Sequence, residues 1–429
     1  MPSFAVRNFG CRANQAEAFS WAEDLRDQGL RLEEDWGRSD LVVVNSCTLT
    51  GRADRDVKKF IRMVGRENPR TKIVVTGCLA ERVPAEMAAM PGVVAVLPQS
   101  AKDGLAERVM ALEVLREMPR RDDTGDRAAV AAEDREASLR ARAYLKIQDG
   151  CDDRCAYCII PSVRGRSRSV PPDALAASVR RLSGRGFREI VLAGIHLSAY
   201  GEDLEPRSSL LSLLRDLSAA AGRSRLRLSS LDPRLTDDEF VAHVAAEGKI
   251  CPHFHLSLQH VSGRILRSMG RPVEAGSYER ILGSLRRLAP DAAIGADVMV
   301  GFPGESEDDF DELRGFLDRS PLTYVHVFSF SARQGTPAAS RPRVPEGIIT
   351  ERAKTLRRLS ALKDFAFRRR FQGRELEAVV IDRSGPKTEV LTGNFIKVAV
   401  PVCQAPEGEL VRVSITRVLP RRTEGEVIA

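Results

Sequence analysis

The sequence predicts an α/β protein with three parts: an N-terminal open parallel α/β sheet, a central incomplete (β/α)6 TIM-like barrel and a small C-terminal all-β barrel. Short apolar runs alternate with helical patterns as far as about residue 370. A charged, alanine-rich segment interrupts this alternation, and beyond Gly373 the pattern changes to a period of two. We therefore expect domains at 1–100, 143–370 and 371–429, with a linker at 101–142.

The N-terminal domain is predicted from four apolar runs: FAVRNF, DLVVVNS, KIVVTG and VVAVL. Helical patterns lie between them at 17–28, at 54–66 and near Met87. Strands that alternate with helices form parallel sheets, because a helical crossover returns the chain to the same edge. The linker that follows contains RRDDTGD, and we expect it to be helical or flexible.

The central barrel is predicted from six strand-like runs that alternate with six helical patterns. A complete barrel of this type has eight such units, so we expect an incomplete one with its chemistry at the carboxyl ends of the strands. The runs are YLKIQ, EIVLAGI, LRLSSL, FHLSLQ, IGADVMVGF and YVHVFSFS. The C-terminal barrel is predicted from RELEAVVID, TEVLTGNF, IKVAVPV and ELVRVSITRVL.

Composition favours a cytoplasmic protein. No uninterrupted apolar run reaches the roughly 18 residues of a membrane-spanning helix, and the first residues lack the pattern of a secretory signal. The formal net charge of +7 suits a polyanionic partner, although a solvated basic surface explains it equally well. The same two interpretations apply to the basic residues of the helix predicted at 346–370, with solvation as the default: Lys354, Arg357, Arg358, Lys363, Arg368, Arg369 and Arg370.

Three closely spaced cysteines follow the first barrel strand. Cys151, Cys155 and Cys158 lie in IQDGCDDRCAYCIIP, on a loop at the predicted catalytic end of the barrel. Three thiolates at this spacing can hold a [4Fe–4S] cluster and leave its fourth iron open. A structural zinc site would need a fourth cysteine or histidine nearby, and no histidine lies there. The sequence therefore predicts an iron–sulfur cluster rather than zinc.

A second set of cysteines is far apart in sequence. Cys11, Cys47 and Cys78 each come directly after a predicted strand of the N-terminal sheet. Because parallel strands end at the same edge of a sheet, the three thiols should converge there, and we expect a second cluster. The alternative is that they are buried free thiols. The remaining cysteines, Cys251 and Cys403, have no partner at ligand spacing and are expected to be ordinary buried thiols.

His253 and His255 lie on one face of a predicted strand in PHFHLSLQH. A metal pair is one interpretation. Packing in the barrel interior or contact with a substrate is the favoured one.

With these two cysteine triads, the chain resembles the methylthiotransferase family of radical S-adenosylmethionine (SAM) enzymes over nearly its whole length. The first domain is similar at NFGCRANQAE, VNSCTLTGRADRDVKKFIR and VVTGCLAER, and the barrel at LKIQDGCDDRCAYCIIP, RLSSLDP, ILRSMGR, VGFPGESEDDF and FSFSARQGTPAA. The resemblance implies an N-terminal methylthiotransferase domain, a radical SAM barrel and a C-terminal RNA-binding TRAM domain. GCRANQAE and CTLTGRADRD look most like the branch that modifies N6-threonylcarbamoyladenosine at position 37 of tRNA.

The resemblance also implies the cofactors and their residues. Cys151, Cys155 and Cys158 would hold the cluster that generates a radical from SAM, and Cys11, Cys47 and Cys78 an auxiliary [4Fe–4S] cluster that carries the sulfur. No catalytic residue is expected beyond these ligands. The ring of Tyr157 would lie near the adenine of SAM, with core packing as the alternative. Further SAM contacts are expected at strand ends, although some of these residues will only form turns: Gly194, Ser229, Ser230, Gln259, Gly301 and Gly304.

The implied partners are the tRNA anticodon loop and an electron donor of the flavodoxin or ferredoxin type. Bases in a single-stranded loop are accessible without opening a helix, which suits an RNA-binding β-barrel. The chain departs from the family pattern after Gln259, where Val261 stands in place of an expected glycine.

Several alternatives remain open. Within the family, these are the same reaction on N6-isopentenyladenosine and methylthiolation of a ribosomal-protein aspartate. From other classes, they are an iron–sulfur electron-transfer protein and an RNA-binding protein with structural zinc.

Overall fold

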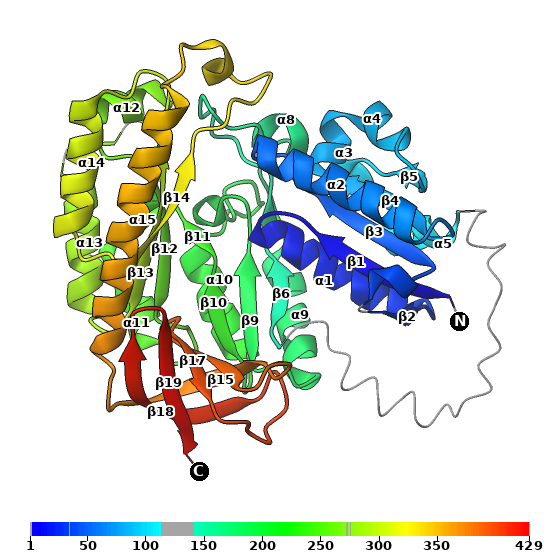
Figure 1. The fold of residues 1–429 in the computed structure, drawn as a ribbon. Helices are drawn as coiled ribbons and strands as arrows, with labels where there is room; N and C mark the ends of the chain where they lie inside the picture. The colour runs from blue at the N-terminus through cyan, green and yellow to red at the C-terminus, as the bar shows by residue number, and fades with distance from the viewer. Residues whose placement is uncertain (1, 34, 113–140, 272, 275, 429) are drawn as a thin grey trace.

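The structure is a computed structural model that describes residues 2–33, 35–112, 141–271, 273–274 and 276–428 (Figure 1). It confirms the predicted fold class: a parallel α/β sheet, a split central barrel and a closed C-terminal β-barrel. Residues 113–140 of the predicted linker lie outside the described residues, so the character of that segment stays a prediction. No helix among the described residues is long and apolar enough to cross a membrane.

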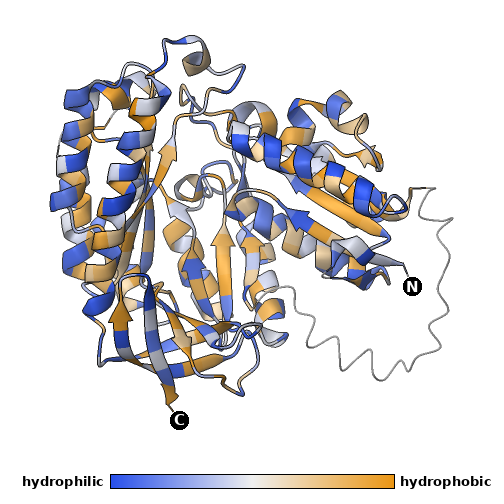
Figure 2. Ribbon diagram, viewed as in Figure 1, coloured by the Kyte–Doolittle hydropathy of each residue, from blue (hydrophilic) through white to orange (hydrophobic). Residues whose placement is uncertain are grey.

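The N-terminal domain is a five-stranded parallel sheet in the order β2-β1-β3-β4-β5, with helices on both faces. One face packs against α1 and α5, and the other against α2, α3 and α4. Figure 2 shows hydrophobic β3 and β4 beneath the largely hydrophilic outer face of α2. The strands are β1 (Ser3–Asn8), β2 (Arg31–Leu32), β3 (Leu41–Ser46), β4 (Lys72–Gly77) and β5 (Val93–Val96), and the helices are α1 (Arg12–Asp27), α2 (Gly51–Glu67), α3 (Cys78–Arg82), α4 (Pro84–Ala88) and α5 (Leu105–Met110).

Helix α5 differs from the expectation that a linker begins at residue 101. Leu105, Ala106 and Val109 are buried in the core of the first domain, because they form one apolar face of a short helix. The N-terminal domain therefore extends at least to Met110.

The central barrel is two parallel sheets in the orders β10-β9-β6 and β11-β12-β13-β14. An isolated bridge between Leu226 and Ile250 joins them. Among the described residues, β14 does not pair with β6, so the barrel stays open on that side. The strands are β6 (Ala143–Lys146), β9 (Glu189–Ala193), β10 (Arg225–Leu228), β11 (Ser230–Leu231), β12 (His253–Gln259), β13 (Ala293–Val300) and β14 (Tyr324–Ser329). The hairpin β7 (Gln148–Asp149) and β8 (Arg168–Ser169) precedes the second barrel strand.

Helices cover the outside of this barrel (Figure 1). They bury the apolar residues of each strand, such as Ile190, Leu256 and Ile294, while the intervening polar residues face the lumen. The helices around the barrel are α9 (Pro172–Gly184), α10 (Leu210–Ala220), α11 (Asp238–Ala246), α12 (Gly263–Ser268), α13 (Ser277–Leu288), α14 (Glu307–Arg319) and α15 (Glu346–Arg369), whereas α8 (Ile160–Arg164) packs on α3 of the N-terminal domain.

The C-terminal domain is a closed barrel in the order β15-β16-β17-β19-β18. Its last strand was not predicted, because β19 alternates charged residues with only two buried positions, Thr423 and Gly425. Gly425 is needed there, since a Cβ would lie 2.5 Å from the carbonyl oxygen of Ser414. The strands are β15 (Glu375–Asp382), β16 (Thr388–Thr392), β17 (Lys397–Val400), β18 (Leu410–Leu419) and β19 (Arg422–Ile428).

A buried ion network joins the C-terminal barrel to the amino ends of the central strands. Glu189 accepts hydrogen bonds from Arg142, Arg225 and Arg227 at 2.8–3.1 Å. Arg225 and Arg227 also donate to backbone oxygens at the end of β16, Leu391 and Thr392, at 2.9 and 3.0 Å. We call Glu189 and these three arginines the barrel floor.

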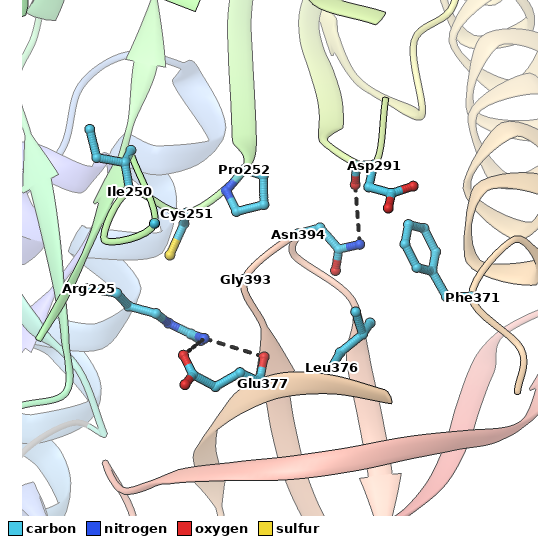
Figure 3. Close-up of a pocket in the computed structure, with 11 residues that line it drawn as sticks. Arg225, Ile250, Cys251, Pro252, Asp291, Phe371, Leu376, Glu377, Gly393 and Asn394 are labelled. Carbon is cyan, nitrogen blue, oxygen red and sulfur yellow. Dashed lines mark hydrogen bonds and ion pairs between the residues drawn. The ribbon is translucent and has the colours of Figure 1, made fainter. Parts of the chain in front are cut away.

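The C-terminal barrel also covers this floor directly. Phe395, in the turn after β16, stacks on His253 with ring centroids 4.2 Å apart. Figure 3 shows Arg225 reaching to Glu377 and Asn394 to Asp291 across a small cavity between the two parts. The lumen is therefore closed at the amino ends of its strands.

The basic residues of α15 are mostly used inside the molecule. Arg368 is buried and donates to the carbonyl oxygens of Leu419 and Pro420, which anchors the C-terminal barrel. Lys363 and Arg357 donate to backbone carbonyls of the central domain in the same way. This helix therefore offers less free positive charge to an RNA than its sequence suggested.

We predict that Glu189→Gln destabilises the protein by about 3–5 kcal/mol, since it removes the buried carboxylate that Arg142, Arg225 and Arg227 share. Burial alone would raise the pKa of Glu189, but Arg227, Arg225 and Arg142 outweigh it and hold the pKa far below its usual range. The carboxylate therefore stabilises the fold above the unfolded pKa of about 4.5, and this contribution is lost as the pH falls from there toward the folded value. Urea unfolding followed by far-UV circular dichroism measures the difference.

The matched control is Glu239→Gln, because the Glu239 side chain is 69% exposed and pairs only with Arg215. It should change the free energy of unfolding by no more than about 0.5 kcal/mol. Equal effects of the two substitutions would contradict the role of the barrel floor.

Candidate functional site

The barrel triad, Cys151, Cys155 and Cys158, lies on the loop after β7, at the carboxyl end of the barrel. Backbone hydrogen bonds fix the loop: the Cys151 N–H donates to Gly165 and the Cys158 N–H to Cys155. Burial raises the pKa of Cys151 to about 11 and that of Cys158 to about 12, and each feels the neighbouring thiols. The three thiols thus lie on one loop and influence one another electrostatically, and their role as cluster ligands stays a prediction.

The N-terminal triad comes together at the carboxyl edge of the first sheet. Cys11 precedes α1, Cys47 follows β3 and Cys78 begins α3 directly after β4. A Cβ on Gly10 would lie 2.9 Å from Cys47 Sγ, so only glycine fits beside that thiol. Burial, together with the neighbouring thiols of Cys11 and Cys78, raises the pKa of Cys47 to about 12.

The two triads lie on either side of one domain contact. Cys78 is buried against Ile159 and Val163, which follow the barrel triad along the chain. Helix α3, which begins with Cys78, packs on α8. The sequence could not show this contact, because the two segments are separated by about 80 residues and by the linker.

Arg164, at the end of α8, connects the two triads. Its guanidinium donates to Glu17 Oε1 at 3.0 Å and to Asp149 Oδ1 at 2.6 Å, and also to Asn14 Oδ1. Asn14 in turn accepts from Cys11 Sγ at 3.4 Å. Arg164 is 2% exposed, so this network lies in the interior between the domains.

Glu17 is the acidic centre of this network. Burial alone would raise its pKa, but Lys102, Arg164 and Lys146 outweigh burial and hold the pKa well below its usual range. Lys102 Nζ lies 2.5 Å from Glu17 Oε2, and Lys146 Nζ lies 3.2 Å from Oε1. Glu17 is therefore ionised at neutral pH.

A second polar contact holds the domains together beyond Cys47. Arg333, which follows β14, donates to Thr48 Oγ1 at 2.9 Å and to Asp54 Oδ2 at 2.6 Å. Asp54 also accepts from Arg82 at 2.6 Å. In the N-terminal domain, each triad cysteine is thus followed within a few residues by a residue that belongs to the Arg164 network or to the Arg333 network.

Of the remaining predicted site residues, Tyr157 lies on the cysteine loop, and the others lie at or near the ends of barrel strands. Gly194 follows β9, where a Cβ would lie 2.8 Å from Leu197 Cδ2 and 3.2 Å from Gln148 Oε1. The Ser229 hydroxyl is buried without a hydrogen-bond partner, whereas Ser230 belongs to β11. The Tyr157 ring packs edge-on against Phe302, with centroids 6.4 Å apart.

Gln259, Gly301 and Gly304 surround the next two strand ends. Gln259 ends β12 with a φ of 64°, an uncommon value for a residue with a side chain. The Gly301 N–H donates to Glu305, and the Glu305 pKa is raised to about 7 by burial, against the opposing effect of Arg352. A Cβ on Gly304 would meet nothing within 4 Å, so this glycine is a turn residue in open space.

Sequence reasoning missed a charged cluster beside Cys155. Arg271 Nη1 lies 3.7 Å from Cys155 Sγ, and Arg271 Nη2 donates to Asp232 Oδ2 at 2.8 Å. Arg234 and His196 also contact Asp232, at 2.7 and 3.3 Å. A cavity of about 230 Å³ next to it is lined by Cys151, Asp152, Asp153, Ser167, His196, Ala199, Glu202 and Arg234. Asp232 belongs to the segment RLSSLDP and Arg271 to ILRSMGR, but the contact between them is created only by folding.

His253 and His255 both face the lumen from β12. Both approach the Tyr324 hydroxyl, at 2.7 and 3.1 Å, and His255 Nε2 lies 2.9 Å from Asp297 Oδ1. His326 approaches the same Asp297 oxygen at 3.4 Å. Hydrogen bonds in the barrel interior link these side chains, and the ligand atoms of His255, Asp297 and His326 lie within 4.8 Å of one another. Both interpretations of the histidine pair therefore stay predictions.

Of the two remaining cysteines, Cys251 is buried and Cys403 half-buried. Cys251 Sγ lies 3.8 Å from Glu189 of the barrel floor. Neither cysteine contributes to the two triads.

Family comparison agrees with this architecture. Residues 145–317 match the Radical SAM superfamily, and residues 3–98 match a family described as Uncharacterized protein family UPF0004. Among solved structures, the radical S-adenosylmethionine methyltransferase TsrM from Kitasatospora setae matches with a TM-score of 0.55 and 14% identity, over 79% of this chain and 75% of that chain. This likeness supports the fold.

Whole-length relatives identify the family more closely. A threonylcarbamoyladenosine tRNA methylthiotransferase MtaB from Aquifex aeolicus is 35% identical, over 96% of this chain and 99% of the relative. The MtaB of Bacillus subtilis is 31% identical over 100% and 97%, and a ribosomal protein uS12 methylthiotransferase RimO from Anaeromyxobacter is 34% identical over 99% and 93%. The chain thus belongs to the radical SAM methylthiotransferase family, as an MtaB-type transferase.

Proposed function

We propose that this enzyme converts N6-threonylcarbamoyladenosine at position 37 of tRNA into its 2-methylthio derivative. One observation carries the proposal: the two cysteine triads face a single domain contact, where Cys78 is buried against Ile159 and Val163. A reaction that needs a radical and a sulfur donor at the same base requires two such sites side by side. The MtaB relatives, which match nearly the whole chain, support the choice of substrate.

Enzymes of this family use SAM and [4Fe–4S] clusters. We assign the radical-generating cluster to Cys151, Cys155 and Cys158, and the auxiliary cluster to Cys11, Cys47 and Cys78. Each triad fits a [4Fe–4S] cluster, because its thiols converge from one loop or one sheet edge and supply three of four ligands. When bound, the two cofactors would supply a carbon-centred radical and a transferable sulfur.

The chain's own residues bind and orient these groups. The buried Ser229 hydroxyl has no hydrogen-bond partner among the described residues and would donate to SAM. Tyr157, Gly194, Ser230, Gln259, Gly301 and Gly304 stand around the same strand ends and are proposed as further contacts. The charged cluster at Asp232 and Arg271 lies next to Cys155 and would orient the polar end of SAM.

The proposed partners are the anticodon loop and a reductant of the flavodoxin or ferredoxin type, which places the reaction in the cytoplasm. The C-terminal barrel carries exposed arginines, Arg383, Arg417 and Arg421, that form no ion pair among the described residues. They can contact phosphate without breaking an internal contact, unlike the basic residues of α15.

The two clusters should be independent. Anaerobically reconstituted protein should contain about eight irons, and each triple variant, Cys151/Cys155/Cys158→Ala or Cys11/Cys47/Cys78→Ala, about four. Iron and acid-labile sulfide analysis measures this. Four irons in the parent protein, with none left in the barrel-triad variant, would mean that the N-terminal triad holds no cluster.

Ser229→Ala should weaken SAM binding about fivefold, the usual effect of losing one hydrogen bond. It should leave the free energy of unfolding nearly unchanged, because the hydroxyl has no partner to lose. Isothermal calorimetry of the reconstituted protein measures the affinity. Ser218→Ala is the matched control, since that hydroxyl on α10 is also buried without a partner. An equal loss of affinity in both variants would remove Ser229 from the site.

The substrate is tested in a strain that lacks this gene. Mass spectrometry of its tRNA nucleosides should show threonylcarbamoyladenosine without the 2-methylthio group, and the wild-type gene should restore the group. Loss of the 2-methylthio group from isopentenyladenosine instead, or of the methylthio group from ribosomal protein uS12, would reassign the enzyme to another branch.

A further inference from the structure

The open side of the central barrel is covered by the N-terminal domain. Helix α1 packs on β6, at the edge where β6 and β14 do not pair within the described chain. Arg12 is the first residue of α1 and directly follows Cys11 of the auxiliary triad. A side chain at this position therefore stands between that triad and the lumen.

Arg12 makes only neutral contacts at this position. Its Nη1 donates to Gln15 Oε1 at 2.8 Å and approaches the Tyr144 hydroxyl at 3.4 Å. Its guanidinium lies 5.9 Å from the centroid of the Tyr144 ring. No carboxylate lies within 4.0 Å of it among the described residues, and the side chain is only half-buried.

The other cations along β6 differ from Arg12. Arg142 pairs with Glu189 at 3.1 Å, and Lys146 pairs with Glu17 and Asp149 at 3.2 and 3.1 Å. Their charges are compensated within the fold. Of these three cations along β6, Arg12 has no ion-pair partner among the described residues. It can therefore pair with an anion from outside the chain.

The charge of Arg12 reaches the opposite wall of the lumen. The pKa of His253 is lowered chiefly by burial, and Arg12 contributes to that shift. Arg12 also acts against the burial that raises the pKa of Tyr324 on β14. Next along the lumen face of β14, the His326 side chain is 54% exposed, with its ring 5.2 Å from that of Tyr324. Two groups able to donate to an anion therefore border this opening from opposite sides.

We propose that Arg12, assisted by His326, binds the carboxylate of the threonylcarbamoyl group and so selects an acidic N6 substituent. This rests on the proposed function, which supplies the nucleoside. Arginine pairs with a carboxylate through two parallel hydrogen bonds, and a carboxylate is what the threonyl part presents. An apolar isopentenyl group would instead shield the guanidinium from water without offering an anion to pair with it. Burying an unpaired charge is unfavourable. The position after Cys11 would hold the substituent beside the auxiliary triad, with the adenine ring between the triads.

The test is binding to anticodon stem-loop RNAs that differ only at position 37. Three are compared by fluorescence anisotropy on anaerobic, reconstituted protein: threonylcarbamoyladenosine, its neutral methyl ester, and unmodified adenosine. The parent protein should bind the acid about 10- to 100-fold more tightly than the ester or adenosine, as expected for one charge-assisted contact. Arg12→Gln should bind all three equally, at the affinity that the parent protein has for adenosine.

Two further variants and a control sharpen the result. Arg12→Lys should restore part of the preference for the acid, and His326→Gln should reduce it by a smaller factor. Arg66→Gln, whose side chain is 78% exposed at the far end of α2, should leave it unchanged. Iron content is measured for each variant. If Arg12→Gln loses iron, the preference for the acid is judged from Arg12→Lys and His326→Gln instead.

The outcomes separate the two claims. If the parent protein prefers the acid and Arg12→Gln keeps that preference, this inference is wrong while the proposed function stands. A stem-loop with isopentenyladenosine is measured on the parent protein as a fourth RNA, and a preference for it over the acid would overturn the proposed function, and this inference with it. Equal binding of acid and ester by a parent protein that still methylthiolates the acid also rejects the carboxylate contact.

Discussion

The arrangement of the active domains depends on one buried guanidinium. Arg164 is only 2% exposed, and a buried charge of this kind is tolerated only when it is paired with opposite charges and hydrogen-bonded. Its partners come from both domains: Glu17 and Asn14 from the N-terminal helix, and Asp149 from the strand before the barrel triad. Shifting either domain would leave a charge unpaired, so the network fixes their relative position along with both triads.

The same logic runs through the polar interior of the barrel. Asp297 pairs with His255 and His326 in the lumen, and the helices outside supply the apolar packing that a solid core would otherwise provide. A radical enzyme needs such an interior, because the reacting base must enter a space that is roomy but tightly ordered. In each strand, the residues that face the lumen thus serve the reaction, and the residues that face the helices stabilise the fold.

The sequence predicted what local pattern can carry, and missed what only tertiary contact creates. Strands with continuous apolar runs, such as β3 and β4, were placed correctly, and Cys47 and Cys78 directly follow these two strands. Strand β19 was missed because its signal is two small buried residues among charges, and α5 because a charged composition hid one apolar face. The basic residues of α15 looked solvent-facing, since nothing local shows that Arg368 reaches carbonyls some 50 residues further on.

The stacking of Phe395 on His253 gives the C-terminal barrel a mechanical role. The sequence predicts this domain to bind RNA. In the structure, Phe395 also closes the lumen at the end away from the clusters. Substrate and product must then enter and leave the lumen through its other end. Bulk water cannot pass through the lumen behind the base. Without Phe395 in this position, water could enter the lumen from the end away from the clusters and quench the radical.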